Sequence, residues 1–165
     1  MIKYSFLTAT LAIILFACNN DGKPELVNEN SPEMTQDQKD ERNKAIVLKC
    51  ISAYAAKDSN YLLAQSVNDV INIHEGRPVR GNDSARIILR QAFRMPTDYK
   101  PTNQIAMAEN NYVFVFQYVD ITDKKGKNIW RAKQVEIFKF NDDGKLIFHN
   151  ACNEDLGPND AKVPF

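Results

Sequence analysis

Two histidines, the only ones in the chain, are the side chains best suited to acid–base chemistry near neutral pH. His74 ends an apolar segment that we expect to be a strand, and from there it can act as a general base. The alternative is a hydrogen-bonded histidine at a strand end, beside the Glu75-Gly76 turn. The same two interpretations, chemical and structural, are open for His149.

Glu136 is the third candidate for acid–base chemistry. It lies in an alternating segment, residues 128–140, and shares its parity with Trp130, Gln134 and Phe138. A carboxyl group that faces the same side as these bulky residues and is desolvated has a raised pKa, and it can then act as an acid or oxyanion donor. The alternative is an ion pair with a neighbouring lysine, arginine or histidine.

Metal and cofactor motifs are not evident. Two histidines and a carboxylate form a plausible ligand set, but no two of these residues have the short spacing of a metal motif. We therefore predict no metal and no other cofactor. The sequence also has no phosphate-binding glycine loop, nucleophile elbow or Cys-x-x-Cys motif, which argues against nucleotide hydrolysis, serine-esterase chemistry and thiol exchange.

The composition is that of one globular domain of ordinary size. The chain has 165 residues, of which 44% are hydrophobic and 10% aromatic, so it can bury a real core. Its formal net charge is zero, which removes the driving force for a general nucleic-acid binder.

The first 18 residues have the pattern of a targeting segment. Lys3 precedes an apolar stretch, residues 6–17, that is too short for a comfortable membrane span. The stretch ends in Leu15-Phe16-Ala17-Cys18, which resembles the lipobox of bacterial lipoproteins. That resemblance implies a signal peptide over residues 1–17, acylation of Cys18, and anchoring in the lipid bilayer of the cell envelope, facing the periplasm or the exterior. The alternative is an ordinary secretory signal in which Cys18 is incidental.

The rest of the chain divides by composition. Residues 18–41 hold the lipidated cysteine and a polar, acidic stretch that we expect to be a flexible tether. The alternative is an added N-terminal strand. The domain follows over residues 42–155, and residues 156–165 form a tail.

The pattern of the domain predicts an α+β fold. Apolar residues at helical spacing predict a helix over residues 41–57, and two more are expected over 61–64 and 85–93. A short hairpin is expected over residues 69–74 and 79–81. Four strands of an antiparallel meander follow, with turns between them, over residues 105–108, 112–122, 128–140 and 146–150. Helices first and a meander last favour helices gathered on one face of the sheet.

This order of elements resembles the nuclear transport factor 2-like, or SnoaL-like, superfamily. The specific stretches are Ile46–Asp58, then Leu62–Gly81 with its Asn68-Asp69 pair, and Phe138-Lys139-Phe140 followed by Asp143-Gly144-Lys145-Leu146. The resemblance covers nearly the whole domain. It implies a curved antiparallel sheet that is wrapped with about three helices into a cone with a pocket.

Within that superfamily, comparison with ketosteroid isomerase implies the site. Its oxyanion tyrosine falls on Cys50, its base aspartate on His74 and its protonated aspartate on Glu136, whereas His149 falls on a pocket-lining position of the last strand. The chain departs from the isomerase at all three catalytic positions, and a thiol is a poorer donor than a phenol. Steroid isomerisation is therefore not expected, but His74, Glu136 and His149 are implied to share one cavity.

Further residues are candidates for ligand binding or a disulfide. Tyr54, Tyr118 and Trp130 can stack on a ligand or fill the core, and Cys50 and Gln134 are also candidate pocket residues. Cys50 and Cys152 are the two thiols left after lipidation, and they form either a disulfide or two reduced buried side chains.

Together these observations predict an anchored lipoprotein whose single domain binds a small, partly apolar molecule. The first alternative is a proton-transfer enzyme, an isomerase or dehydratase, with His74 as base and Glu136 or His149 as acid. The second is a protein-interaction module that forms a homodimer through its open sheet face.

Overall fold

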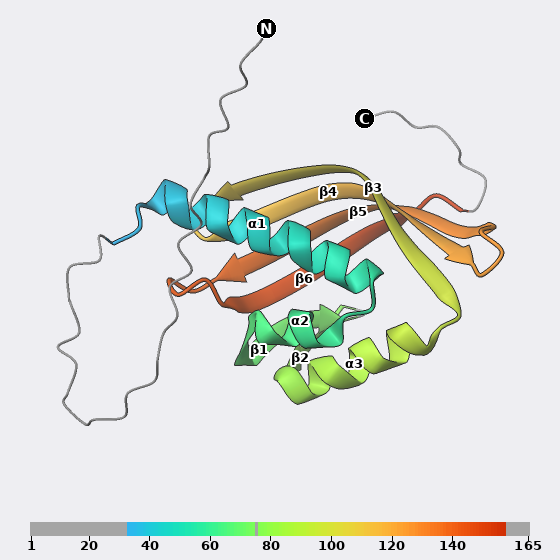
Figure 1. Cartoon of the computed structure of the whole chain (residues 1–165), viewed down its shortest axis with the longest axis horizontal. Helices are drawn as coiled ribbons and strands as arrows, with labels where there is room; N and C mark the ends of the chain where they lie inside the picture. The colour runs from blue at the N-terminus through green and yellow to red at the C-terminus, as the bar shows by residue number, and fades with distance from the viewer. Residues whose placement is uncertain (1–32, 75, 158–165) are drawn as a thin grey trace, which may run out of the picture. The chain divides into compact units, whose positions relative to one another are not determined.

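The computed structural model describes residues 33–74 and 76–157. The predicted signal peptide, Cys18, most of the predicted tether and the end of the tail lie outside the described residues. Within them the elements, shown in Figure 1, are α1 (Gln36–Ala55), α2 (Ser59–Ala64), β1 (Ser66–His74), β2 (Arg77–Arg80), α3 (Asn82–Arg94), β3 (Thr97–Glu109), β4 (Tyr112–Asp123), β5 (Asn128–Phe140) and β6 (Leu146–Asp155). The predicted α+β class, with three helices, a hairpin and a meander, is confirmed.

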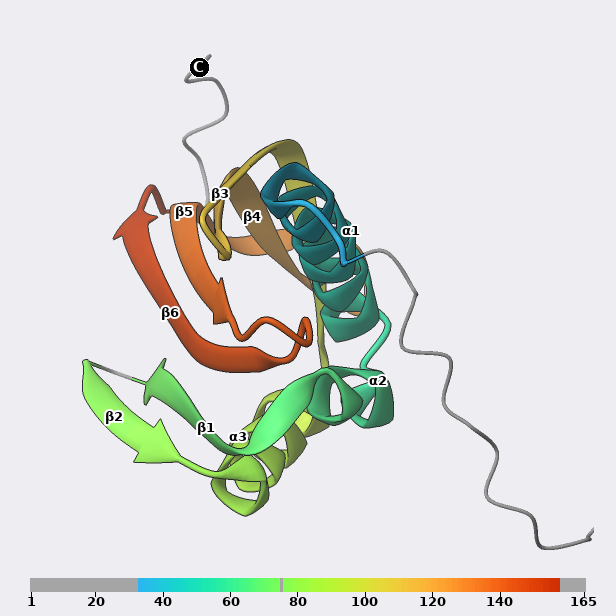
Figure 2. The same ribbon diagram turned by 90° about the vertical axis from the view of Figure 1, so that its left-hand side faces the viewer.

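The strands form one curved sheet in the order β2-β1-β6-β5-β4-β3. All neighbouring strands are antiparallel except β1 and β6, whose parallel pairing joins the hairpin to the meander. Figure 2 shows the sheet bending around α1. We call the face that α1 covers the inner face and the opposite face the outer face. This curved sheet with its covering helices is the cone implied by the resemblance.

Strand β3 is longer than the sequence predicts. It begins at Thr97 instead of residue 105, and it includes Pro101 and a bulge between Thr102 and Ile105. Because β3 is an edge strand, Pro101 can lie within it without removing a hydrogen bond from the ladder. The proline was therefore misleading as a boundary of the meander.

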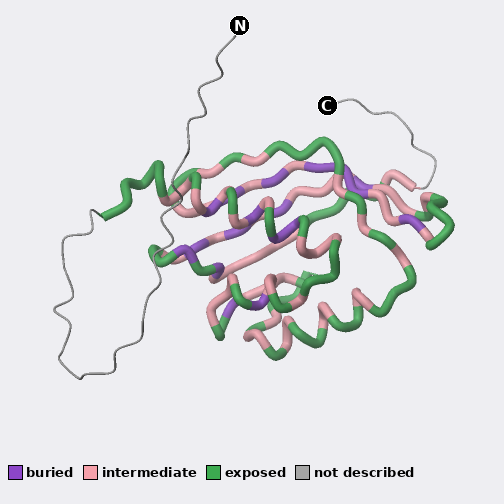
Figure 3. Tube along the Cα trace, in the orientation of Figure 1, coloured by how far each residue is buried: buried purple, intermediate pink, exposed green. Residues whose placement is uncertain are grey.

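The core lies between α1 and the inner face. It contains eight buried apolar residues from α1 and four strands: Val47, Ile51, Val70, Val113, Val115, Phe138, Phe140 and Leu146. Burial alternates along β4, with Val113 and Val115 pointing inward and Tyr112, Phe114 and Phe116 only partly buried. Most buried positions of the sheet lie in β4 and β5, as the purple segments of Figure 3 show. Each fully buried valine side chain contributes roughly 1.5–3 kcal/mol.

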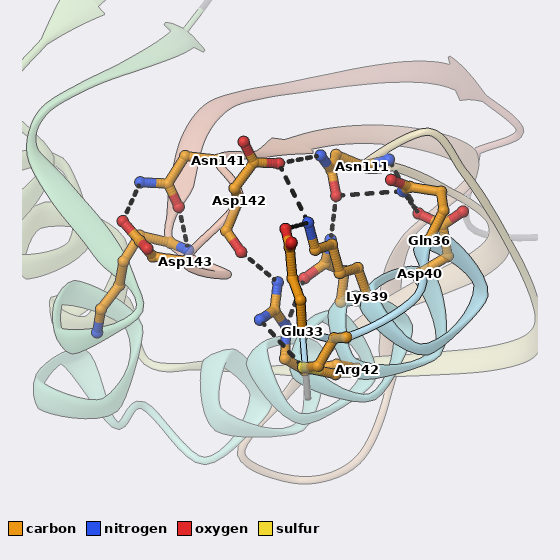
Figure 4. Close-up of polar contacts among 12 residues, drawn as sticks. Glu33, Gln36, Lys39, Asp40, Arg42, Asn111, Asn141, Asp142 and Asp143 are labelled. Carbon is orange, nitrogen blue, oxygen red and sulfur yellow. Dashed lines mark hydrogen bonds and ion pairs between the residues drawn. The ribbon is translucent and has the colours of Figure 1, made fainter. Parts of the chain in front are cut away.

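Helix α1 begins at Gln36, five residues before the predicted start, so part of the expected tether is helical. Thr35 and Gln38 form a capping box at its first turn. Asp40 accepts hydrogen bonds from the backbone N–H groups of Asn110 and Asn111, at 3.0 and 2.9 Å, in the turn between β3 and β4 (Figure 4). These polar contacts hold the first turns of α1, which bury no large apolar side chain.

A second turn completes this attachment. Asn111 donates from Nδ2 to the Asp142 carboxylate at 3.2 Å, and the Arg42 guanidinium donates to the Asp142 carbonyl at 3.2 Å. Both contacts are visible in Figure 4. Helix α1 is thereby fixed to the β3–β4 and β5–β6 turns, and this contact sets its position over the inner face.

No helix in the described residues is long and apolar enough to cross a membrane.

Candidate functional site

A buried polar cluster interrupts the apolar inner face. Gln117 of β4 and Glu136 of β5 are 1% and 7% exposed, and Gln117 is paired in register with Gln134, two residues before Glu136. Trp130, Gln134, Glu136 and Phe138 share one face of β5, as their parity predicts. A carboxylate this deeply buried is costly unless it is hydrogen-bonded or paired.

His149 is the first partner of that carboxylate. Its Nε2 atom lies 3.0 Å from Oε2 of Glu136. The imidazole stacks on Phe138, its register partner, with 4.6 Å between ring centroids, so the ring is held in place. A neutral His149 with its proton on Nε2 donates a hydrogen bond to Glu136, and a protonated one forms an ion pair with it.

Gln117 is the second partner. Its Nε2 atom lies 2.7 Å from Glu136 Oε1, 2.6 Å from Gln134 Oε1 and 2.9 Å from the Tyr99 hydroxyl. An amide nitrogen carries two hydrogens, so these three acceptors compete for it. Gln104 in turn donates to Gln117 Oε1 at 2.8 Å. The amide can therefore exchange partners without being left unsatisfied.

The groups around Glu136 are held in their neutral forms. Burial, and secondarily the charge of Glu136, raises the pKa of Cys50 from 9.0 to about 12. The same two causes raise the pKa of Tyr54 and of Tyr99 above their usual value of 10.0. At neutral pH the thiol and both phenols therefore keep their protons. Tyr99 uses its proton in a 2.9 Å hydrogen bond to Gln134 Oε1.

His74 is not part of this cluster. It lies exposed at the end of β1, opposite Arg77, and among the described residues it makes no side-chain hydrogen bond or ring contact. Asn72 is the register partner of His149 on β1. Since a strand rises about 3.3 Å per residue, His74 lies roughly 7 Å farther along. The structure brings Glu136 and His149 together and leaves His74 apart.

The aromatic candidates divide between the two faces. Tyr54 packs edge-on against Tyr99, with 5.0 Å between ring centroids, and against Phe93 at 5.2 Å. Trp130 is half-buried on the inner face near one end of β5. Tyr118 follows Gln117 on β4, so its side chain points to the outer face, away from the cluster, where it lies opposite Lys133. It is buried there.

The two thiols are not joined. Cys50 is buried on α1, whereas Cys152 is exposed on β6, and both are free. Cys152 is paired in register with Val135, which alternates with Glu136 and therefore faces outward. Because the two thiols lie on opposite faces of the sheet, the disulfide alternative is wrong.

Gln117 and Tyr99 belong to the site but were not among the predicted residues. A signal for Gln117 was present: it is a lone amide at an inward position of the apolar strand 112–119. Tyr99 carried no such signal, because its segment lies before Pro101 and outside the predicted meander. In the part of the chain that the structure describes, no group of three histidine, cysteine, aspartate or glutamate residues could hold a metal ion.

A cavity lies on the outer face of the sheet. Its volume is about 460 Å³, and its lining includes Ile71, Arg80, Tyr112, Lys139 and Phe148. These residues come from a row across β2, β1, β6, β5 and β4 in register. The cavity is therefore separated from the Glu136 cluster by the thickness of the sheet.

The cluster can do two kinds of chemistry. A buried carboxylate with an oriented imidazole can hold a hydroxyl or carbonyl group by hydrogen bonds. It can also move a proton, since one group accepts while the other donates. Burial strengthens both effects because the local dielectric constant is low.

Comparisons with known proteins bear on the fold. No protein-family model matches the chain. No curated protein matches its sequence. Solved structures do match. A proposed polyketide cyclase of Xanthomonas campestris pv. campestris has a TM-score of 0.59 at 17% identity, over 68% of this chain and 90% of that one.

Two further structures agree with this likeness. AclR of Streptomyces galilaeus, a proposed hydroxylase, has a TM-score of 0.57 at 18% identity, over 70% of this chain and 90% of that one. The epoxide hydrolase/cyclase-like enzyme SalBIII, of pyran ring formation in salinomycin, has a TM-score of 0.58 at 14% identity, over 73% of this chain and 95% of that one. At these identities the likeness concerns the fold alone, and the chain has the nuclear transport factor 2-like, or SnoaL-like, fold.

Proposed function

We propose that the chain binds a small, partly apolar molecule against the inner face of the sheet, with Glu136 and His149 as its polar anchor. The observation that carries the proposal is the buried Glu136 carboxylate, held by Gln117 at 2.7 Å and by His149 at 3.0 Å. A carboxylate has about four lone-pair sites, so each oxygen can accept a further hydrogen bond.

The surroundings support a ligand with an apolar body and one polar group. Phe138 stacks on the ring of His149, and the phenols of Tyr54 on α1 and Tyr99 on β3 lie close enough to Glu136 for its charge to raise their pKa. In the described residues the second ring nitrogen of His149, Nδ1, has no hydrogen bond, and its side chain is 26% exposed. Two of the proteins with a similar fold are named as a cyclase and a cyclase-like enzyme, and this analogy of fold also supports a small-molecule ligand.

Titration with two probes tests this proposal. We choose 2-naphthol, an aromatic alcohol, and cyclohexanone, an apolar ketone, and follow binding to the full chain by calorimetry. We expect saturable binding of at least one probe at one site, weakened at least tenfold by Glu136→Gln. The matched control is Glu109→Gln, an exposed carboxylate on β3, which should leave binding unchanged. Equal affinities for the two variants would contradict the proposal.

Proton transfer is a second candidate function, which the 3.0 Å contact of His149 with Glu136 favours. In this version His149 takes a proton from a carbon next to a carbonyl group, and Glu136 orients the imidazole and stabilises its charged form. NMR in heavy water can follow hydrogen exchange at the α-carbon of cyclohexanone. We expect the full chain to accelerate exchange and His149→Gln to abolish the acceleration without unfolding the chain. Hydrogen exchange no faster than in buffer would contradict proton transfer, and ligand binding would remain the only function proposed for Glu136 and His149.

Anchoring in the cell envelope through Cys18 is also a proposal. It rests on the lipobox-like Leu15-Phe16-Ala17-Cys18 sequence. Mass spectrometry of the protein from bacterial membranes should find an N-terminal peptide that begins at an acylated Cys18, and Cys18→Ser should release the protein from the membrane. An unmodified Cys18 would contradict this proposal.

The outer face supports a homodimer as a further candidate. Ile105 and Met107 of the edge strand β3 are 49% and 52% exposed, and they lie beside their register partners Phe116 and Phe114. This apolar row is continuous across adjacent strands, so a second copy of the same face can cover it. Light scattering should give a dimer mass that falls to the monomer mass in Met107→Lys. A monomer at high concentration would exclude the dimer.

A further inference from the structure

A cleft between the start of α2 and helix α3 carries three arginines that the proposed function does not use. Its volume is about 260 Å³, and it is lined by Ser59, Arg86, Arg90, Phe93 and Arg94. Figure 1 shows α2 and α3 beside each other, below α1. No acidic side chain is among the residues that line the cleft.

The three guanidinium groups lie on one side of α3. Their spacing of four residues places Arg86, Arg90 and Arg94 on consecutive turns, and like charges at this spacing destabilise a helix. Among residues 33–74 and 76–157 none of the three forms an ion pair, and Asp83, on the turn before Arg86, forms none either. The positive charge of the cleft is therefore not neutralised within the described fold.

A fourth cation adds to the same region. Lys57 donates from Nζ to the carbonyl oxygens of Phe93 and Met95, at 3.5 and 3.2 Å, at the end of α3. Its ammonium group is thus held beside the last arginine of the cleft. Arg86, Arg90, Arg94 and Lys57 therefore gather four positive charges in this region, although the whole chain has a formal net charge of zero.

We propose that this arginine cleft binds a phosphate group. A single carboxylate is satisfied by one guanidinium fork, whereas a phosphate has enough oxygens to accept hydrogen bonds from several forks and from the hydroxyl of Ser59. Phe93 supplies an apolar wall for the group that carries the phosphate. The source is either a free phosphate compound or the headgroup of an anionic lipid.

The inference is independent of the proposed function. Phe93 lines the cleft, and its ring also contacts Tyr54 of α1, with 5.2 Å between ring centroids. Arg86, Arg90 and Arg94 make no contact with Glu136, His149 or Gln117. Loss of phosphate binding would therefore leave the binding of 2-naphthol or cyclohexanone unchanged.

Two binding arms on the full chain test the proposal and separate the sources. In the first, calorimetry measures binding of inorganic pyrophosphate. In the second, co-sedimentation measures binding to phosphatidylcholine vesicles with and without phosphatidylglycerol. The test variant is Arg90→Gln, and the matched control is Arg77→Gln, which removes an equal charge from an exposed arginine of β2 outside the cleft. Arg90→Lys keeps the charge but loses the planar fork.

We expect saturable binding in at least one arm, reduced at least tenfold in Arg90→Gln, reduced less in Arg90→Lys and unchanged in Arg77→Gln. Binding of pyrophosphate assigns a free phosphate compound, and binding only to the phosphatidylglycerol vesicles assigns a lipid headgroup. No binding in either arm overturns the proposal. Equal losses in Arg90→Gln and Arg77→Gln also overturn it, because they would mean attraction by net charge alone. Circular dichroism confirms that each variant is folded.

Discussion

The imidazole Nε2 of His149 lies 3.0 Å from the Oε2 atom of Glu136, across the neighbouring strands β6 and β5. The contact joins a ring that is 26% exposed to a carboxylate whose side chain is 10% exposed. A solvent-accessible imidazole is therefore coupled to a buried charge. This coupling is the basis of both functions proposed for the inner face.

The two histidines should differ in their effect on binding. We expect His149→Gln to weaken binding of 2-naphthol or cyclohexanone at least tenfold, because it removes the group that orients Glu136. His74→Gln should leave binding within twofold of the unmodified chain, because His74 is exposed and makes no contact with the cluster in the described structure. Calorimetric titration of both variants measures the difference. A larger effect of His74→Gln than of His149→Gln would contradict the placement of the site at Glu136 and His149.

Gln117 should be essential to the stability of the cluster. Gln117→Leu removes a hydrogen-bond partner from Glu136, Tyr99 and Gln134 at a position that is 1% exposed. Leaving such groups unsatisfied costs about 1–3 kcal/mol, so we expect the free energy of unfolding to fall by that amount. Urea denaturation measures it, with the exposed Gln91→Leu of α3 as control. Equal stability of the two variants would mean that the cluster contributes nothing net.

The attachment of α1 should depend on Asp40. Asp40→Ala removes the acceptor of the Asn110 and Asn111 backbone N–H groups, which are exposed or part-buried, so we expect a loss of about 0.5–1.5 kcal/mol in the free energy of unfolding. Asp37→Ala, an exposed carboxylate in the first turn of the same helix, is the matched control and should cost less. Urea denaturation of the two variants decides the point. A larger loss for Asp37→Ala would mean that negative charge at the start of α1 stabilises the fold more than the contact of Asp40 with the β3–β4 turn.

Stability should fall at alkaline pH. Cys50 has its pKa raised from 9.0 to about 12, and the pKa values of Tyr54 and Tyr99 are also raised. Above pH 9 the unfolded chain loses protons that the folded chain keeps, so the free energy of unfolding declines by up to about 1.4 kcal/mol per pH unit for each group. Below pH 9 the contribution of Cys50 is fully present.

Urea denaturation at pH 7, 9 and 10 measures this slope. Cys50→Ala should make the slope between pH 9 and 10 shallower, whereas the exposed Cys152→Ala should leave it unchanged. The slope is compared within each variant, so a constant loss of packing in Cys50→Ala does not affect the result. An unchanged slope in Cys50→Ala would contradict the assignment.

Much of the fold could be predicted because local patterns determine it. The bounds of β5 agree with the predicted segment 128–140, whose buried residues Ala132, Glu136, Phe138 and Phe140 share one parity. Glu136 was identified for the same reason. Helix α1 was predicted too short, because residues 36–41 are held by polar contacts to distant turns, which apolar periodicity does not reveal.

The site was predicted only in part because its contacts are long-range. The neighbours of Glu136 come from β3, β4 and β6, and their approach depends on register and on the curvature of the sheet. Tyr99 lies in the cluster because β3 begins at Thr97, before Pro101, whereas the prediction took Pro101 as the limit of the meander. The disulfide failed for a related reason: sequence distance could not tell which face of β6 carries Cys152.

The placement of the ligand beside Glu136 and His149 is tested most directly by mapping bound 2-naphthol and cyclohexanone on the isotope-labelled full chain by NMR. If the ligand binds at the inner face, the backbone amides of Gln117, Glu136 and His149 show saturable shifts that are lost in Glu136→Gln. Shifts confined to the outer face, around Tyr112 and Phe148, or the absence of saturable shifts for either probe, would contradict it.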